Sequence, residues 1–197
     1  MRGNAVLHFI KFKLGLDRPH SQTTTAEQGA IRRYANGAIN AIEIGVYEGV
    51  NTVLIANQLG KNGKLFGIDP FFRGKLGICY HEQIARQQIK QLLLDQKIHI
   101  ISKLSFDASA DVPASGIDFI FVDGDHSLEG IEKDWNLFSV KVKKGGIIAL
   151  HDTSIPTHDA TVANLGSFKY FNSTIKYDER FTILETVDSL NILQRKQ

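Results

Sequence analysis

The feature that most constrains the fold of this chain is a short apolar run that contains an acid and is followed by two glycines. Residues 41–44 form the run, with Glu43 as the acid. Gly45 and Gly49 follow it, and a helical pattern begins directly after them. A second apolar run then ends in Asp69. This order predicts strand, glycine turn, helix and strand, the beginning of a nucleotide-binding α/β sheet whose ligand lies at the carboxyl ends of the strands.

Apolar runs and helical patterns continue to alternate along the chain. We expect helices at residues 25–34, 50–59, 81–94 and 127–138, and parallel strands at residues 41–44, 64–68, 98–101, 117–122 and 147–150. The first helix has a capping-box pattern, because Glu27 follows Thr24 by three residues. The runs 181–187 and 190–194 are joined by only two residues, which suits an antiparallel hairpin and not a helical crossover.

These elements together predict the fold class. We expect an α/β fold with a Rossmann-like, doubly wound, mostly parallel seven-stranded sheet that ends in a C-terminal antiparallel hairpin. A chain of 197 residues with 43% apolar residues can bury the core of one globular domain. We expect an N-terminal arm or helix at residues 1–24 and a single domain at residues 25–197.

Charge and residue usage narrow the classes of partner. A net charge of +2 is too small to favour nucleic acid or an anionic membrane surface. No apolar stretch reaches the ~20 residues that span a bilayer, and the N-terminal residues lack a signal-peptide pattern. Cys79 is the single cysteine, so the chain has no internal disulfide. We expect a cytoplasmic protein with no nucleic-acid partner and no stable membrane association. Whether the chain forms a homodimer stays an open question.

The turn after the first strand is the expected cofactor site. Gly45 and Gly49 lack the Cβ atoms that would keep a ligand from the backbone. Asp69 at the end of the second strand can accept hydrogen bonds from a ribose diol. Tyr47 stands at the second glycine position of the dinucleotide fingerprint, which argues against a nicotinamide cofactor. For Glu43 two roles stay open, ligand binding through water and support of the glycine turn.

Ionisable side chains follow two later strands. Asp123, Asp125 and His126 follow the strand at 117–122, and His151 and Asp152 follow the strand at 147–150. Because parallel strands end at one edge of a sheet, we expect these five groups to converge. In one mechanism Asp123 and Asp152 hold Mg²⁺ or another divalent cation, with a further ligand from Asp125 or His151.

A second mechanism needs no metal. His126 or His151 then acts as the general base, because an ordinary histidine pKa of ~6.5 suits proton removal near neutral pH. Asp125 could also serve only as the N-cap of the helix that follows.

These motifs resemble those of class I S-adenosylmethionine-dependent methyltransferases. Residues 43–52 resemble motif I, and residues 67–69 resemble motif II. Residues 117–127 and 144–153 resemble the later motifs of the type-24 methyltransferase domain family, to which catechol O-methyltransferase is a more distant relative. The resemblance covers roughly residues 25–194.

The resemblance implies an enzyme that transfers a methyl group from S-adenosylmethionine to a small hydroxylated acceptor, such as a sugar or glycoside. The cofactor-binding residues that it implies are Glu43, Gly45, Tyr47, Gly49, Asp69, Pro70, Leu104, Ser105 and Asp123. Leu104 stands where many relatives have an acid near adenine, so apolar packing of Leu104 with Phe71 would replace a polar contact. It also implies that His126 is the base, and that His151 stands where the catechol enzyme has a metal-binding carboxylate.

Two other functions stay open from the sequence. One is a module that binds S-adenosylmethionine without catalysis. The other is a nicotinamide-dependent oxidoreductase, against which the missing third glycine and the terminal hairpin argue.

Overall fold

The computed structural model describes residues 5–74 and 77–196. Its helices are α1 (Ala5–Lys13), α2 (Thr25–Ala35), α3 (Val50–Gln58), α4 (Tyr80–Gln91), α5 (Ser105–Ala108), α6 (Leu128–Phe138) and α7 (Gly166–Ser173). Its strands are β1 (Asn40–Ile44), β2 (Lys64–Ile68), β3 (Ile98–Ile101), β4 (Ile117–Val122), β5 (Val142–Leu150), β6 (Phe181–Val187) and β7 (Leu190–Arg195). Short 3₁₀ helices lie at Ser139–Lys141, Ala160–Asn164 and Ile175–Tyr177.

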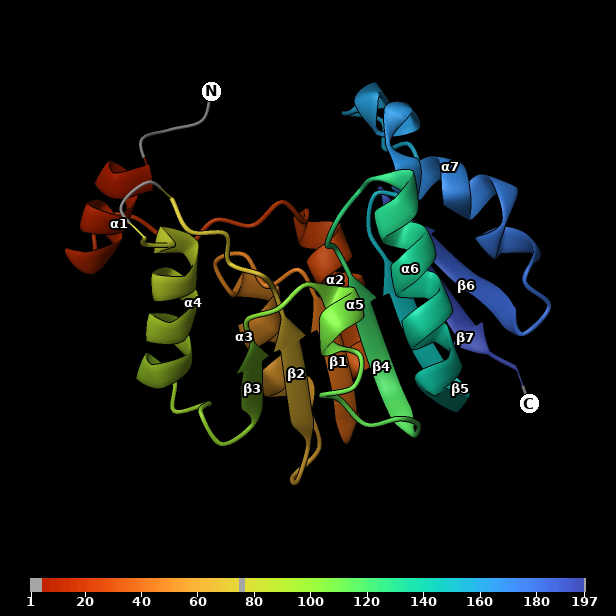
Figure 1. The fold of residues 1–197 in the computed structure, drawn as a ribbon, viewed down its shortest axis with the longest axis horizontal. Helices are drawn as coiled ribbons and strands as arrows, with labels where there is room; N and C mark the ends of the chain where they lie inside the picture. Colours follow the sequence, from red (N-terminus) through yellow and green to blue (C-terminus); the bar gives the residue numbers. More distant parts are fainter. Residues whose placement is uncertain (1–4, 75–76, 197) are drawn as a thin grey trace.

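Within these residues the seven strands form one sheet in the order β3-β2-β1-β4-β5-β7-β6 (Figure 1). Strands β1 to β5 are parallel, whereas β7 runs antiparallel to both β5 and β6. The predicted fold class and the C-terminal hairpin are therefore confirmed. The strand order reverses direction between β1 and β4, and a crevice outside such a switch point is where ligands bind in open α/β sheets.

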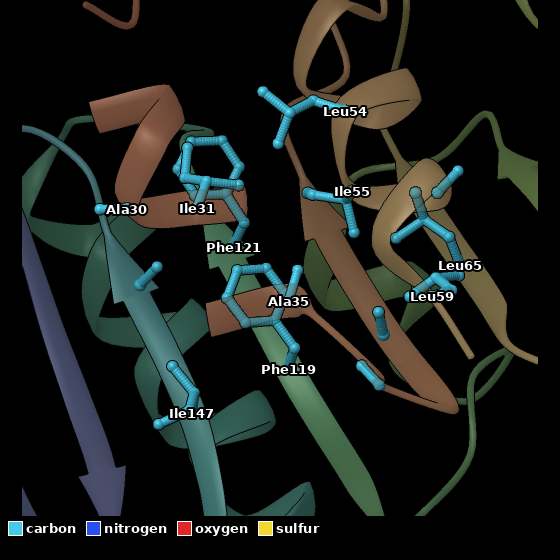
Figure 2. Packing of buried hydrophobic residues seen from close by; sticks show 14 of the residues in the cluster. Ala30, Ile31, Ala35, Leu54, Ile55, Leu59, Leu65, Phe119, Phe121 and Ile147 are labelled. Atoms are coloured by element: carbon cyan, nitrogen blue, oxygen red, sulfur yellow. The ribbon is translucent and has the colours of Figure 1, made fainter. Parts of the chain in front are cut away.

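Helices cover both faces of the sheet, so each face has its own core. Side chains of α2 and α3 pack on one face, with Ile31 and Ile55 against the aromatic rings of Phe119 and Phe121 on β4 (Figure 2). The other face lies under α5, α6 and α7 (Figure 1). Strand β4 is buried on both faces, which explains why its sequence is almost continuously apolar.

Two boundaries differ from the sequence prediction. Strand β5 begins at Val142, five residues earlier than expected, because its pairing with β4 shifts register and Gly145 has a φ of +74°. Helix α4 ends at Gln91, three residues early, because Leu93 takes a left-handed φ of +57° that an α-helix cannot continue through.

The capping box that begins α2 is confirmed. The Thr24 side chain accepts a hydrogen bond from the Glu27 amide, and the Glu27 carboxylate accepts one from the Thr24 amide. The N-terminal segment contains α1, which lies beside α4 and packs Phe9 against Tyr80 (Figure 1). In the described part of the chain, none of the helices has the length and apolar character that crossing a bilayer would require.

Candidate functional site

The glycine turn brings the ends of β1 and β4 unusually close together. Gly45 has a φ of +93°, and a Cβ atom there would lie 2.0 Å from the carbonyl oxygen of Asp123. No other residue type fits this position without moving one of the two strands. Gly49 also has a positive φ, but a Cβ atom there would meet Ala85 on α4. Gly49 thus supports helix packing, whereas Gly45 lies on the wall of a cavity.

We expect Gly45→Ala to destabilise the fold by more than the ~1–2 kcal/mol that the left-handed conformation alone costs. The added methyl group must push the β4 end away, so ligand binding at the turn should fall as well. Gly37→Ala is the matched control, because Gly37 has a φ of +80° but open space around its missing Cβ. Urea unfolding of both variants measures the difference, and equal losses would show that the close approach to Asp123 is unimportant.

The carboxylate of Asp69 supports the turn from the end of β2. Its Oδ2 accepts hydrogen bonds from the amides of Val46 (3.0 Å) and Tyr47 (2.9 Å), and its Oδ1 accepts one from the amide of Phe71 (2.8 Å). An ionised carboxylate has about four acceptor sites, so three bonds leave capacity for a ligand hydroxyl. Asp69 lies on the cavity wall, as a ribose-binding residue must.

A cavity of about 440 Å³ connects the glycine turn to the ionisable groups after β4. The predicted residues that line it are Gly45, Tyr47, Asp69, Pro70, Leu104, Ser105, Asp123, Asp125 and His126. The cavity also reaches the first turn of α3 at Val50 and Asn51. Among the described residues no side chain caps this helix end, so its amides are available to a ligand carboxylate. The cavity therefore offers an anion-binding end and a carboxylate for hydroxyl groups.

Glu43 lies below the turn and not on the cavity wall. Its side chain is fully buried, and neither carboxylate oxygen has a hydrogen-bond partner among the described residues. Burial raises the pKa of Glu43 well above its usual range, and the nearby charges of Asp123 and Asp69 act in the same direction. Burial therefore favours the neutral, protonated form of Glu43.

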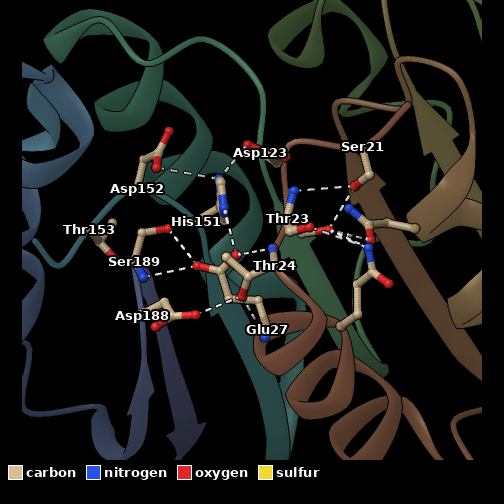
Figure 3. Close-up of polar contacts among 12 residues, drawn as sticks. Ser21, Thr23, Thr24, Glu27, Asp123, His151, Asp152, Thr153, Asp188 and Ser189 are labelled. Carbon is tan, nitrogen blue, oxygen red and sulfur yellow. Dashed lines mark hydrogen bonds and ion pairs between the residues drawn. The ribbon is translucent and has the colours of Figure 1, made fainter. Parts of the chain in front are cut away.

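A chain of charged groups runs from α2 to the end of β4 (Figure 3). The buried ring of His151 contacts Asp123 Oδ1 through Nδ1 (2.9 Å) and Glu27 Oε2 through Nε2 (3.4 Å). Burial alone would lower the pKa of His151, but the hydrogen bonds to Asp123 and Glu27 outweigh it and raise the pKa to about 10. His151 is therefore an imidazolium that donates from both nitrogens. In this state it has no lone pair for a metal or for a proton.

His126 has a different environment. Its ring nitrogens lie 3.8 Å from Asp123 Oδ1 and 3.6 Å from Asp152 Oδ2, which is beyond hydrogen-bonding distance. The side chain is 30% exposed and lines the large cavity. Of the two predicted bases, His126 is the one whose nitrogens a bound molecule can reach.

Known proteins resemble this chain in sequence and in fold. The sequence profile of a family described as a methyltransferase domain, type 24, matches residues 42–153, more than half of the chain. The chain belongs to the type-24 methyltransferase domain family. The match includes the glycine turn, Asp69 and both groups of ionisable residues, so the predicted recognition is confirmed.

Individual relatives are more distant. An uncharacterized protein of Acanthamoeba polyphaga mimivirus is 29% identical over 145 residues, which cover 66% of this chain and 62% of the viral protein. The "Probable caffeoyl-CoA O-methyltransferase 3" of Dictyostelium discoideum is 27% identical over 184 residues, covering 81% of this chain and 69% of that protein. The crystal structure of an O-methyltransferase from Bacillus cereus in complex with SAH has a TM-score of 0.65 and 20% identity, and covers 100% of this chain and 92% of that one.

In the described part of the chain, one group of residues near β4 fits a divalent cation. Asp123, His126 and Asp152 each offer a ligand atom, and these atoms lie within 4.8 Å of one another. Two carboxylate oxygens and one imidazole suit a divalent ion, although fewer oxygens are present than Mg²⁺ usually takes from protein and water together. The sequence predicted Asp123 and Asp152 as ligands, with a further ligand from Asp125 or His151. His151 lies nearer to Asp123 than His126 does, but both of its nitrogens already contact carboxylates, so the group contains His126 instead.

Asp125 does not cap the helix after β4. The N-cap of α6 is Ser127, whose hydroxyl accepts a hydrogen bond from the Gly130 amide. Asp125 instead accepts hydrogen bonds from the amide and the hydroxyl of Ser127, both at 2.9 Å. The alternative that Asp125 is the N-cap was therefore wrong, because Ser127, two residues later, takes that role. Asp125 is exposed and lies on the cavity rim, so a catalytic role for it stays a prediction.

The adenine side of the expected site has apolar and polar parts. Leu104 and Ser105 line the cavity at the start of α5. The Ser105 hydroxyl donates to Asp134, and burial raises the pKa of Asp134 to about 6. Phe71 does not join Leu104 as expected, because it is buried against Val46 and Cys79 in a separate cluster.

Several cavity residues were not predicted from the sequence. Phe72, the neighbour of Phe71, lies on the cavity wall and is 77% exposed. His20, Ser21 and Gln22 reach the same cavity from the segment before α2. The adjacent Phe71-Phe72 pair is a signal that an aromatic ring borders the site, but which ring does so depends on the left-handed φ of +44° at Phe71.

Proposed function

We propose that this chain is an S-adenosylmethionine-dependent O-methyltransferase that acts on a small hydroxylated acceptor. The observation that carries the proposal is the single cavity that joins Gly45 and Asp69 to Asp123 and His126. Methyl transfer needs both halves of such a site, because the donor and the acceptor oxygen must meet in line within one enclosed space. A module that only binds the cofactor would have no use for the second half.

The residues supply binding and proton removal. S-adenosylmethionine, when bound, supplies the electrophilic methyl group. Asp69 accepts hydrogen bonds from the ribose hydroxyls, and the uncapped amides of α3 hold the methionine carboxylate. Leu104 and Phe72 provide apolar surface for the adenine. His126 removes the proton of the acceptor hydroxyl from the opposite end of the cavity.

The charges around Asp123 explain why His126 can accept that proton. Asp123 and Asp152 lie within 4 Å of His126, and negative charges at this distance stabilise a developing imidazolium. His151 pairs with Asp123 from the other side and holds the carboxylate in place. A divalent cation held by Asp123, Asp152 and His126 would instead lower the pKa of the acceptor hydroxyl, and His126 would then not act as the base.

A sugar or glycoside is the acceptor class that we favour. Family similarity motivates this choice, and the polar residues near the acceptor end support it. Gln22 lines the large cavity and also a neighbouring cavity of about 160 Å³, which Asp152, His158 and Asp159 line as well. A molecule with several hydroxyl groups could hydrogen-bond to these side chains.

A methyl-transfer screen tests the proposed function. The protein is incubated with S-adenosylmethionine carrying a labelled methyl group and with panels of sugars, glycosides and phenols, with Mg²⁺ or with a chelator. We expect label transfer to hydroxylated acceptors. Tight cofactor binding in a calorimeter without transfer to any acceptor would favour a binding module. Loss of methyl transfer in the presence of the chelator would show that the reaction follows the metal-dependent mechanism.

We expect Asp69→Ala to weaken S-adenosylmethionine binding by about 1–3 kcal/mol, the cost of losing hydrogen bonds to a charged group. Calorimetric titration measures the affinity, and thermal unfolding checks that the turn survives the loss of its three amide contacts. Asp95→Ala is the control, because Asp95 is exposed between α4 and β3. A folded Asp69→Ala variant with unchanged affinity would remove Asp69 from the cofactor site.

A further inference from the structure

A second group of metal-binding side chains lies on the other side of the glycine turn. His8 of α1, His20 of the following segment and Glu48 of the turn each offer one ligand atom, and these atoms lie within 4.8 Å of one another. They come from three separate parts of the chain. The proposed methyl-transfer chemistry uses none of these three side chains as an acid, a base or a metal ligand.

His8 has a carboxylate at each of its two ring nitrogens. Its Nδ1 contacts Asp17 Oδ2 at 2.8 Å, and its Nε2 faces Glu48 Oε2 at 3.1 Å. When a carboxylate binds one ring nitrogen of histidine, it fixes the tautomer and leaves the other nitrogen free to bind a metal. Asp17 holds Nδ1 of His8 in this way, and the proton on Nε2, which is now bonded to Glu48, would have to leave when zinc binds. The ring of His20 is stacked on that of His8 with centroids 3.9 Å apart.

Glu48 is an unusually well-held carboxylate. It is fully buried, its Oε1 contacts His81 Nδ1 at 3.0 Å, and its Oε2 accepts a hydrogen bond from the His20 amide at 2.6 Å. Because its position is fixed from several sides, Glu48 would lose little conformational freedom on binding an ion.

The chemical types of the three ligand atoms indicate which metal ion would bind. Two imidazoles and one carboxylate are the ligand set of zinc sites that keep a fourth position open. Tetrahedral zinc with bonds of 2.0–2.1 Å places neighbouring ligand atoms about 3.3 Å apart, and the 3.1 Å between His8 Nε2 and Glu48 Oε2 is close to that value. Mg²⁺ prefers oxygen ligands and would not compete effectively here.

We propose that His8, His20 and Glu48 form a zinc site that fastens the N-terminal segment to the glycine turn, with Asp17 orienting His8. Glu48 lies between Tyr47 and Gly49, and His20 lines the large cavity. An ion here would hold α1 against the glycine turn and keep residues 20–22 over the cavity.

Zinc titration of the full chain tests the site. Tag-free protein stripped of metal is titrated with ZnCl₂ in a calorimeter, in the presence of excess MgCl₂ to occupy the oxygen-rich group near β4. Hydrogen exchange of residues 5–13 with and without zinc is the second readout. We expect a single zinc ion per chain and slower exchange of α1 amides. His20→Asn should weaken zinc binding at least tenfold and abolish the protection, and Asp17→Asn should weaken it by about 10–100-fold.

Two variants serve as controls. His99 is exposed on β3, so His99→Asn should leave zinc binding unchanged. Asp152→Asn disrupts the other candidate group and should also leave it unchanged. His20 is exposed and bonds Glu48 through its backbone amide, so His20→Asn should fold normally. No binding of zinc, binding that His20→Asn leaves intact, or binding that only Asp152→Asn removes would each overturn the proposal.

Discussion

Replacing His126 by alanine should lower methyl transfer by about 10²–10⁴-fold, the usual contribution of a general base. The affinity for S-adenosylmethionine should stay unchanged, because His126 lies at the acceptor end of the cavity, across from Asp69. The physical reason is that the acceptor hydroxyl must lose its proton as the new bond forms. His126 lines the cavity beside Asp123 and Asp152. Its ring nitrogens lie beyond hydrogen-bonding distance of these two carboxylates and can therefore accept a proton.

The measurement is single-turnover transfer to the best acceptor, together with calorimetric titration of the cofactor. His99→Ala on β3 is the matched control and should retain full activity. Near-normal transfer by His126→Ala would exclude His126 as the base. A parallel loss of cofactor affinity would instead show that the ring contributes to the cofactor site.

Replacing Glu27 by glutamine should destabilise the fold by about 3–5 kcal/mol, the cost of removing one partner from a buried ion pair. Glu27 is 1% exposed, and its carboxylate accepts hydrogen bonds from the amide and hydroxyl of Ser189 and the amide of Thr24. It also faces the imidazolium of His151. The variant leaves that buried cation with Asp123 as its main counter-charge.

Urea unfolding measures the loss. Glu129→Gln is the control, because Glu129 forms an exposed pair with Lys133, and exposed ion pairs contribute little to stability. An equal effect of the two substitutions would contradict the account of the buried pair.

The pH dependence of this loss has a defined direction. Burial would raise the pKa of Glu27, but hydrogen bonds from His151, Thr24 and Ser189 lower it from 4.5 to about 2. A depressed carboxyl pKa gives stability that is present above the unfolded-state value and is lost as the pH falls through the folded-state value. The advantage of the native chain over Glu27→Gln should therefore be full above pH 4.5 and shrink between 4.5 and about 2.

The sequence predicts the site best where local chemistry determines the structure. Gly45 and Asp69 were found because an apolar run that ends in glycine or aspartate marks a strand end, and parallel strands end at one edge. The capping box likewise placed Glu27 at the first turn of α2. In each case the signal and its structural consequence lie within a few residues.

Contacts between distant segments were not predictable in this way. Glu27 meets His151 across 124 positions of sequence, and this contact makes His151 a buried cation and not a free base. The folding of residues 20–22 over the cavity depends on how α1 docks on α4, which no local pattern specifies. Helix α7 was missed as well, because its eight residues include little apolar periodicity beyond Phe168 and Phe171.

The most direct test of the central claim is a crystal structure of the chain with S-adenosylhomocysteine and Mg²⁺. We expect the ribose at Asp69, the methionine carboxylate at the first turn of α3 and the sulfur atom facing Asp123 and His126. A nucleoside bound elsewhere, or one whose sulfur faces away from the β4 end, would contradict it.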